Sequence, residues 1–269
     1  MGLSVSFIGY GEVGSTFSRD LLRNGVGRIL AYDILLDDPA RLAAMLERMT
    51  HDGVTPADTL ANAAGAGDVV FSAVTADAVE EVARAAAPFL RPGQIFLDLN
   101  SASPSTKRRA AEIVQAGGAD YVEGAVMAPV AEPRLAVSIL GGGPAAERAA
   151  ALLNPLGMNI RPVAVEHGRA SAMKLCRSIM IKGLEALIID CADASAAWRV
   201  QDEVFSSLGQ SFPSIDWPAL AVTMRARVER HGVRRAAEMR EAGEMLAALG
   251  LEPGLCQAVA ERHEQVAKR

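Results

Sequence analysis

Lys174, Ser178 and Lys182 follow one another at intervals of four residues, the spacing that places side chains on one face of an α-helix. Their neighbours include Met173 and Met180, so the surroundings are partly apolar. An amine that is partly removed from water beside another cation has a lowered pKa, and it can then take a proton from a substrate and return it. The same spacing is typical of exposed lysines on a solvent-facing helix, and the sequence leaves both interpretations open.

A glycine-rich segment indicates a second kind of chemistry. Three glycines with GxGxxG spacing lie between an apolar run, residues 3–8, and a helical pattern, residues 13–23. The first glycine permits a tight turn, the second lets the backbone approach a diphosphate, and the third lets the helix pack closely on the strand. The alternative is a turn that only packs a helix on a strand. A dinucleotide site here would be lined by Gly9, Tyr10, Gly11, Glu12, Val13 and Gly14.

Asp33 follows the next expected strand, residues 28–32. In dinucleotide sites the acid that binds the ribose follows the glycines by ~20 residues, and Asp33 has about this spacing. A carboxylate accepts hydrogen bonds from both ribose hydroxyls and repels a 2′-phosphate, so Asp33 favours NAD over NADP. Nearby Arg41 could pair with a phosphate, which keeps NADP as the alternative.

Small polar residues follow two further expected strands, residues 69–74 and 95–99. In open α/β sheets ligands bind beyond the carboxyl ends of the strands, so these segments are expected to line a nicotinamide and substrate pocket. Ser103 is also the expected cap of a helix that begins at Pro104, and capping alone would explain part of the pattern. The residues expected in the pocket are Val74, Thr75, Asn100 and Ser101.

The fold class follows from the alternation of β-rich runs with helical patterns along the first part of the chain. This alternation predicts parallel βαβ units and therefore an α/β, doubly wound sheet. A long helical pattern, residues 167–198, follows a last expected strand, and helices broken at Pro213, Pro218, Gly232 and residues 250–253 make up the remainder. We expect a dinucleotide-binding domain over residues 1–165 and an all-α substrate and dimerisation domain over residues 166–269.

Composition narrows the class of protein. The 269 residues carry 27 basic and 32 acidic side chains, a net charge of −5, which argues against broad nucleic-acid binding. Cys176, Cys191 and Cys256 lie in apolar, helix-like stretches without metal-binding spacing, so reduced thiols and no metal are expected. No apolar segment of about 18 residues is present, and neither a membrane span nor a secretory signal is expected. We expect a cytoplasmic protein.

Residues 1–195 resemble the β-hydroxyacid dehydrogenase and 6-phosphogluconate dehydrogenase superfamily in the order and spacing of four motifs. These are the glycines between Gly9 and Gly14, the block from Asp98 to Pro104, the turn from Leu140 to Gly143, and Gly168 with Lys174. The resemblance implies a Rossmann domain, a helical C-terminal domain through which the protein forms a homodimer, and hydride transfer at a hydroxyl-bearing carbon.

The resemblance also implies roles for individual residues. Lys174 matches the family's general acid and base, and Asn100 with Ser101 matches a substrate-contacting pair. Ser178 stands where the family places an amide and offers fewer donors. The segment that begins at Met127 stands where the family has its Ser-Gly-Gly substrate anchor, so this anchor differs here.

The C-terminal region resembles a shorter phosphogluconate-dehydrogenase-like domain, on residues 230–239 and 249–253. His231, Arg234 and Glu238 share a helical face at offsets of three and seven residues. This face could reach a polar or anionic substrate, or it could be a solvated face with intrahelical ion pairs. Met127, His231 and Arg234 are therefore candidate substrate contacts.

Together these observations predict an NAD-dependent enzyme, with NADP as an alternative cofactor, that oxidises a small polar hydroxy acid or sugar acid. Three alternatives remain. Oxidation could be followed by decarboxylation or isomerisation of a sugar acid. Imine reduction is disfavoured because relatives specialised for imines commonly replace the lysine that is present here. A dinucleotide-binding regulatory protein without turnover is the non-enzymatic alternative.

Overall fold

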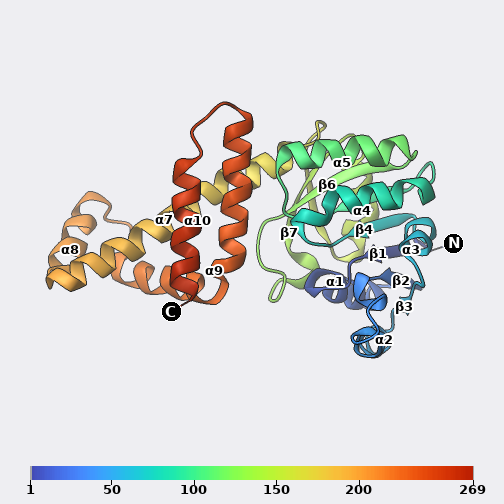
Figure 1. Ribbon diagram of the computed structural model, residues 1–269, viewed down its shortest axis with the longest axis horizontal. Helices are drawn as coiled ribbons and strands as arrows, with labels where there is room; N and C mark the ends of the chain where they lie inside the picture. Colours follow the sequence, from blue (N-terminus) through green and yellow to red (C-terminus); the bar gives the residue numbers. More distant parts are fainter. Residues whose placement is uncertain (1, 269) are drawn as a thin grey trace. The chain divides into compact units, whose positions relative to one another are not determined.

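The computed structural model describes residues 2–268 of the chain. Their internal contacts divide the chain into two compact units, Met1–Lys174 and Leu175–Arg269. The first contains a β-sheet with helices, and the described residues of the second form helices joined by short non-helical segments (Figure 1). No helix within residues 2–268 has the length and apolar character needed to cross a membrane.

The first unit is built on one eight-stranded sheet with the order β3-β2-β1-β4-β5-β6-β7-β8. All neighbouring strands are parallel except β6 and β7, which pair antiparallel. From β1 the chain adds β2 and β3 on one side of the sheet and then β4 and the later strands on the other side. This change of direction confirms the predicted doubly wound α/β fold. The strands are β1 Val5–Ile8, β2 Ile29–Tyr32, β3 Thr55–Pro56, β4 Val69–Ser72, β5 Ile95–Asp98, β6 Asp120–Val126, β7 Ser138–Gly142 and β8 Asn159–Ala164.

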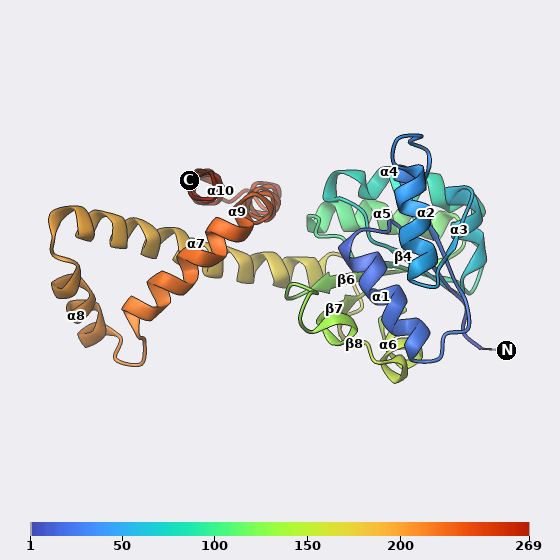
Figure 2. The ribbon, with the colours of Figure 1, turned by 90° about the horizontal axis from the view of Figure 1, so that it is seen from below.

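Helices cover both faces of this sheet (Figures 1 and 2). Side chains from α1, α2 and α6 pack in the hydrophobic cluster on one face, and those from α3, α4 and α5 pack in the cluster on the other. The central strands β1, β4 and β5 are therefore buried at every position. The helices are α1 Glu12–Arg23, α2 Leu42–His51, α3 Leu60–Ala66, α4 Val79–Ala86, α5 Pro104–Ala116 and α6 Ala146–Leu153.

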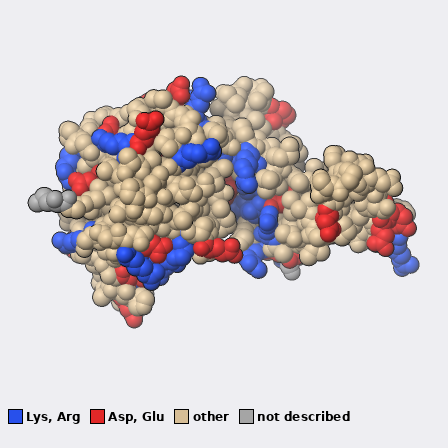
Figure 3. All heavy atoms as spheres, turned by 180° about the vertical axis from the view of Figure 1, so that it is seen from behind, with Lys and Arg blue, Asp and Glu red and all other residues tan. Residues whose placement is uncertain are grey.

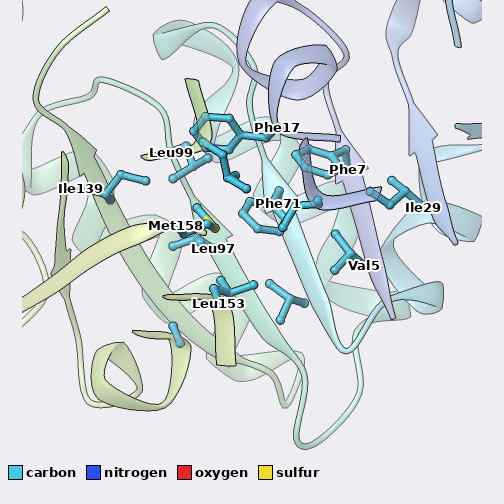
Figure 4. Close-up of a cluster of buried hydrophobic side chains, with 14 of the residues drawn as sticks. Val5, Phe7, Phe17, Ile29, Phe71, Leu97, Leu99, Ile139, Leu153 and Met158 are labelled. Carbon is cyan, nitrogen blue, oxygen red and sulfur yellow. The ribbon is translucent and has the colours of Figure 1, made fainter. Parts of the chain in front are cut away.

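Successive strand residues alternate between the two faces, as a pleated strand requires. Phe7 belongs to one cluster and Ile8 to the other. Phe7 stacks on Phe71 of the neighbouring strand with ring centroids 4.6 Å apart (Figure 4). These buried strands end at one edge of the sheet, and the segments beyond them carry the polar residues of the candidate site.

The second unit is formed by helices α7, α8, α9 and α10. Helix α7, Arg169–Trp198, begins in the first unit and continues into the second. Helix α8 spans Gln201–Ser211, α9 spans Trp217–Ala248, and α10 spans Gly254–Ala267. Helices α9 and α10 lie side by side in Figures 1 and 2. A cluster of buried side chains from α7, α8 and α9 includes Trp217 and forms part of the core of this unit.

Two of the predicted helix breaks are wrong. Pro218 lies in the first turn of α9, where its missing N–H costs nothing because that group would have no partner inside the helix. Gly232 lies inside α9 and is buried. A Cβ at this position would be 2.5 Å from the carbonyl oxygen of His263, so the glycine lets α10 pack closely against α9 rather than ending the helix. The chain leaves helical structure at Pro213 and between Leu251 and Pro253, as predicted.

Candidate functional site

The glycine segment forms a tight turn between β1 and α1. Gly9 has a φ of +96°, and a Cβ there would lie 2.3 Å from the carbonyl oxygen of Ala73. A Cβ on Gly14 would lie 2.4 Å from the carbonyl oxygen of Gly9. Gly11, by contrast, faces open space with no atom within 4 Å of a Cβ position. The turn is thus closed by backbone at its first and third glycines and open at its second.

The open side of the turn meets the start of α1. Gly11 is the N-cap of this helix, and no side chain caps it. The first N–H groups of a helix have no partner within the helix, and together with the positive end of the helix dipole they bind phosphate groups. Glu12 is exposed and Val13 is half-buried in this first turn. The turn therefore has both the space and the donors that a dinucleotide diphosphate requires.

Tyr10 contributes to this turn only through its backbone. Its side chain is buried, and the hydroxyl donates a hydrogen bond to Oδ2 of Asp52 at 2.9 Å. Burial, followed by the hydrogen bond to Asp52, raises the pKa of this hydroxyl far above its ordinary value. Arg48 of α2 lies over the tyrosine ring and donates to the carbonyl oxygen of Gly11 at 3.2 Å and to Oγ of Ser15 at 2.6 Å. Nothing in the local sequence pattern around Arg48 indicates that it lies at this turn.

Asp33 lies at the end of β2 and is half-buried. Its Oδ2 accepts a hydrogen bond from the N–H of Tyr10 at 2.7 Å, and its Oδ1 accepts one from the N–H of Leu35 at 3.0 Å. These bonds orient the carboxylate beside the glycine turn, and each oxygen keeps a further lone pair for a ribose hydroxyl. Arg41 is paired with Asp38 at 3.5 Å.

Asn100 connects the segments that follow β4 and β5. Its Oδ1 accepts the N–H of Val74 at 2.6 Å. Its Nδ2 donates to Oγ of Ser72 at 3.0 Å and to Oδ1 of Asp98 at 2.7 Å. Val74 and Asn100 therefore lie together as expected, and both side-chain N–H groups of Asn100 are used within the protein. Thr75 is exposed at the start of the following turn.

A buried cluster of polar side chains lies behind Asn100. Lys107 is 0% exposed, and its Nζ lies 2.8 Å from Oδ1 of Asp98. The hydroxyl of Tyr121 donates to Oδ2 of Asp98 at 2.6 Å. Burial and the adjacent carboxylate raise the pKa of Tyr121 well above its ordinary value. No sequence pattern indicates this cluster, because its members come from β5, α5 and β6 and share no local spacing.

Lys174 is half-buried in α7, and its Nζ donates a hydrogen bond to Oγ of Ser101. The structure thus brings together two of the predicted site residues from distant parts of the sequence. One turn before Lys174, the backbone N–H of Ala170 donates to the buried carboxylate of Glu123 at 2.8 Å. Like Arg48 and Lys107, Glu123 has no local sequence pattern that indicates a place in the site.

Ser178 and Lys182 continue the same row of α7 within the helical unit. Lys182 is only 5% exposed, and its Nζ donates to Oγ of Ser178 at 2.9 Å and to Oε2 of Glu238 at 2.7 Å. Burial lowers the pKa of Lys182, while the carboxylate of Glu238 acts in the opposite direction. The interpretation of this lysine as a solvent-exposed side chain is therefore wrong.

The remaining candidates belong to different units of the chain. Met127 is half-buried at the end of β6 and packs against a small cluster that includes Ala125 and Leu140. On α9, His231 is half-buried and Arg234 is exposed. Residues 2–268 contain no group of three or more acidic, histidine or cysteine side chains that could hold a metal ion. The three cysteines are free.

A doubly wound sheet with an open glycine turn and an acid at the end of the next strand defines a dinucleotide-binding domain of the Rossmann type. The sequence matches the same class of protein. Residues 4–164 match the family described as the NAD binding domain of 6-phosphogluconate dehydrogenase, and the chain belongs to this family. Residues 196–266 match a domain of unknown function, DUF1932.

Individual relatives agree with this assignment. The 2-(hydroxymethyl)glutarate dehydrogenase of Eubacterium barkeri is 25% identical over 222 residues, which cover 78% of this chain and 71% of that enzyme. A conserved hypothetical protein from Sinorhizobium meliloti 1021 is 38% identical, with a TM-score of 0.87 and coverage of 100% and 89%. The 3-hydroxyisobutyrate dehydrogenase of Mycobacterium tuberculosis, at 18% identity, has the same fold, with a TM-score of 0.80 and coverage of 100% and 94%. The predicted superfamily, the predicted class of NAD(P)-dependent dehydrogenase and the predicted cofactor are thereby confirmed.

Proposed function

We propose that the protein catalyses reversible, NAD-linked oxidation at the hydroxyl-bearing carbon of a small hydroxy acid or sugar acid, with Lys174 as the general acid and base. The observation that carries this proposal is the hydrogen bond from Lys174 Nζ to Ser101 Oγ, in the segment that follows β5. This is the edge of the sheet at which α/β proteins bind their ligands. The substrate of the Eubacterium barkeri relative, 2-(hydroxymethyl)glutarate, supports a hydroxy acid.

The bound nicotinamide supplies the acceptor for hydride. In the direction of oxidation, the neutral amine of Lys174 takes the proton of the substrate hydroxyl, and in the reverse direction the ammonium group returns it. Ser101 accepts a hydrogen bond from Lys174, and its own hydroxyl proton is then available for a substrate oxygen. The pair holds the reacting hydroxyl in line for proton transfer, which lowers the entropic part of the barrier.

Asn100 and Ser178 have different parts in this proposal. Both side-chain N–H groups of Asn100 are used by Ser72 and Asp98, so Asn100 contributes mainly by holding Ser101 and the backbone of Val74 in place. Ser178 accepts a hydrogen bond from Lys182 and keeps its hydroxyl proton for a substrate oxygen. Met127, His231 and Arg234 remain the proposed contacts to the distal part of the substrate.

Asp33 supports NAD as the preferred cofactor. The negative charge that Tyr10 and Leu35 orient at the end of β2 would repel a 2′-phosphate. Arg41, the cation that follows Asp33 in the sequence, is paired with Asp38. We therefore propose that Gly9, Gly11, Gly14 and Asp33 bind NAD within a domain of residues 1–165.

The helical domain, residues 166–269, is proposed to bind substrate and to form a homodimer. Its surface carries many large apolar side chains that are exposed in the single chain, and in Figure 3 wide areas of it show no charged residue. Burial of such a surface stabilises association. The exposed residues are Met173, Met180, Leu187, Trp198, Val200, Phe212, Val222, Val233, Leu249, Leu251 and Leu255. We also propose a cytoplasmic location, because free cysteines are typical of a reducing compartment and all three cysteines are free.

The test is a panel of small hydroxy acids and sugar acids incubated with NAD, in which NADH formation is followed by absorbance and carbon dioxide release is measured in parallel. We expect NADH formation with at least one hydroxy acid and no carbon dioxide. Carbon dioxide in proportion to NADH would favour oxidative decarboxylation of a sugar acid. Binding of NAD without turnover on any member of the panel would favour the regulatory protein.

A further inference from the structure

Two buried carboxylates occupy facing positions on neighbouring strands of the sheet. Asp98 of β5 and Glu123 of β6 are partners in the parallel register of these strands, and they are 1% and 0% exposed. Asp98 has a buried cationic partner, Lys107, with 2.8 Å between Nζ and Oδ1. The hydrogen-bond donors to Glu123 come instead from the beginning of α7. A carboxylate buried at this depth is retained only where donors satisfy it.

Glu123 caps the N-terminus of α7 from outside the helix. Its Oε1 accepts the backbone N–H of Ala170 at 2.8 Å, and its Oε2 accepts the hydroxyl proton of Ser171 at 3.1 Å. Burial raises the pKa of Glu123, and the hydrogen bond from Ala170, the charge of Lys107 and the hydrogen bond from Ser171 act against this rise. A carboxylate at the positive end of a helix also interacts favourably with the helix dipole.

The position of this carboxylate is closely determined. Gly142 of β7 lies opposite Glu123 in the antiparallel register. A Cβ on Gly142 would be 2.3 Å from Oε1 of Glu123, so the side chain occupies the space that any other residue at 142 would need. The cap therefore connects α7 to the interior of the sheet rather than to a mobile surface loop.

Asp98 acts in the same way on the other side of the site. Its Oδ1 accepts the backbone N–H of Asn100 at 2.9 Å as well as the side-chain N–H of that residue at 2.7 Å. Ser101 follows Asn100 directly. The two carboxylates thus hold the two partners of one contact: Asp98 holds the segment with Ser101, and Glu123 holds the helix with Lys174.

We propose that Glu123 is a positioning residue, which fixes the first turn of α7 and thereby places Lys174 against Ser101. Lys174 follows Ala170 by four residues, about one helical turn, so a shift or fraying of the first turn moves the amine directly. The consequence for turnover rests on the function proposed above. The consequence for the environment of the Lys174 amine does not depend on it.

Glu123→Ala removes both acceptors, and Glu123→Gln keeps one oxygen while it places an NH₂ group against a donor. We expect kcat to fall by about 10²-fold for Glu123→Ala, as a displacement of about 1 Å can cost, and by a smaller factor for Glu123→Gln. The dissociation constant for NAD, measured by calorimetry, should stay unchanged. Asp20→Asn is the matched control, because Asp20 is a poorly exposed carboxylate whose partner is Arg134 rather than the start of α7.

Amine labelling tests the position of Lys174 without any substrate. The lysines of the chain are Lys107, Lys174, Lys182 and Lys268. Lys107 and Lys182 are buried, and exposed Lys268 is an internal standard. After brief acetylation by a succinimidyl ester, peptide mass spectrometry gives the rate at each site. In Glu123→Ala we expect the rate at Lys174 to rise at least threefold relative to Lys268, and in Asp20→Asn we expect no change.

Ser171→Ala serves where Glu123→Ala does not fold, because it removes only the hydroxyl donor and leaves the carboxylate in place. It should raise labelling of Lys174 in the same direction by a smaller factor. Unchanged labelling of Lys174 in folded Glu123→Ala, or in Ser171→Ala if only that variant folds, would overturn the positioning role. Increased labelling supports it even if the wild-type protein turns over no hydroxy acid, and in that case the proposed function alone fails.

Discussion

The amine of Lys174 donates a hydrogen bond to the hydroxyl of Ser101, although 73 residues separate the two positions in the chain. Lys174 lies in α7, and Ser101 lies in the segment that follows β5. A half-buried amine in contact with a hydroxyl at the ligand-binding edge of the sheet is suited to proton transfer.

Lys174→Ala should lower kcat by roughly two to four orders of magnitude, the usual contribution of a general acid or base. The affinity for NAD should not change, because the glycine turn and Asp33 lie elsewhere in the domain. Steady-state kinetics and calorimetry with NAD measure the two effects separately. Lys268→Ala, at an exposed lysine, is the control and should behave like the wild type. Wild-type turnover in the Lys174 variant would exclude the proposed mechanism.

Gly11→Ala and Gly14→Ala should separate cofactor binding from folding. A Cβ on Gly11 meets no atom within 4 Å, so Gly11→Ala should keep its melting temperature and lose affinity for NAD, because the methyl group enters the space proposed for the diphosphate. A Cβ on Gly14 would lie 2.4 Å from a backbone oxygen, so Gly14→Ala should be destabilised, by about 1–3 kcal/mol as overpacking usually costs. Thermal unfolding measures the stability of both variants, and calorimetry measures their affinity for NAD. Undiminished affinity for NAD in Gly11→Ala would mean that the cofactor binds elsewhere.

Asp33→Asn should weaken NAD binding and reduce discrimination against NADP. The substitution removes the charge that repels a 2′-phosphate and one acceptor for the ribose hydroxyls. Hydrogen bonds to a charged group contribute about 1.5–3 kcal/mol, so we expect a loss of roughly 10- to 100-fold in affinity for NAD. Asp37→Asn, at an acid that binds the Tyr32 hydroxyl instead, is the control. The ratio of the dissociation constants for NADP and NAD measures this discrimination. An unchanged ratio in Asp33→Asn would contradict the role of Asp33 in cofactor preference.

His263 should make the stability of the helical unit depend on pH. Burial, then the charges of Arg235 and Lys182, lowers the pKa of His263 to about 4. The unfolded chain binds this proton near the ordinary pKa of about 6.5. Between these values the unfolded state holds more protons than the folded state, so stability falls as the pH is lowered from about 6.5 to about 4.

Urea unfolding at several pH values measures this effect, and both tryptophans of the chain lie in the helical unit, so their fluorescence reports on it. His263→Gln should show a smaller loss of stability across the same pH range. Equal pH dependence in the two proteins would show that other groups cause the acid sensitivity.

Some elements could not be predicted from local patterns. The strand Ser138–Gly142 ends in two glycines, which ordinarily indicate a turn or a weakened strand. In the structure, Gly142 lies in the strand, and the side chain of Glu123 fills the space that a Cβ at this position would need. Gly232 shows the same effect within α9, where the backbone of α10 approaches. In both cases the glycine is required because a segment distant in sequence approaches closely. The residues next to the glycine in sequence do not indicate that approach.

The sequence by itself determined the features that depend on neighbours along the chain: the glycine turn after β1, the acid at the end of β2, the class of fold and the family. These follow from backbone geometry and short-range spacing, which are properties of consecutive residues. Only the tertiary structure decided that Lys174 meets Ser101, that the amide of Asn100 is used internally, and that Lys182 is buried beside Glu238. Those contacts depend on which strands and helices become neighbours and in what register, and residues far apart in the chain acquire that relationship only when the core has packed.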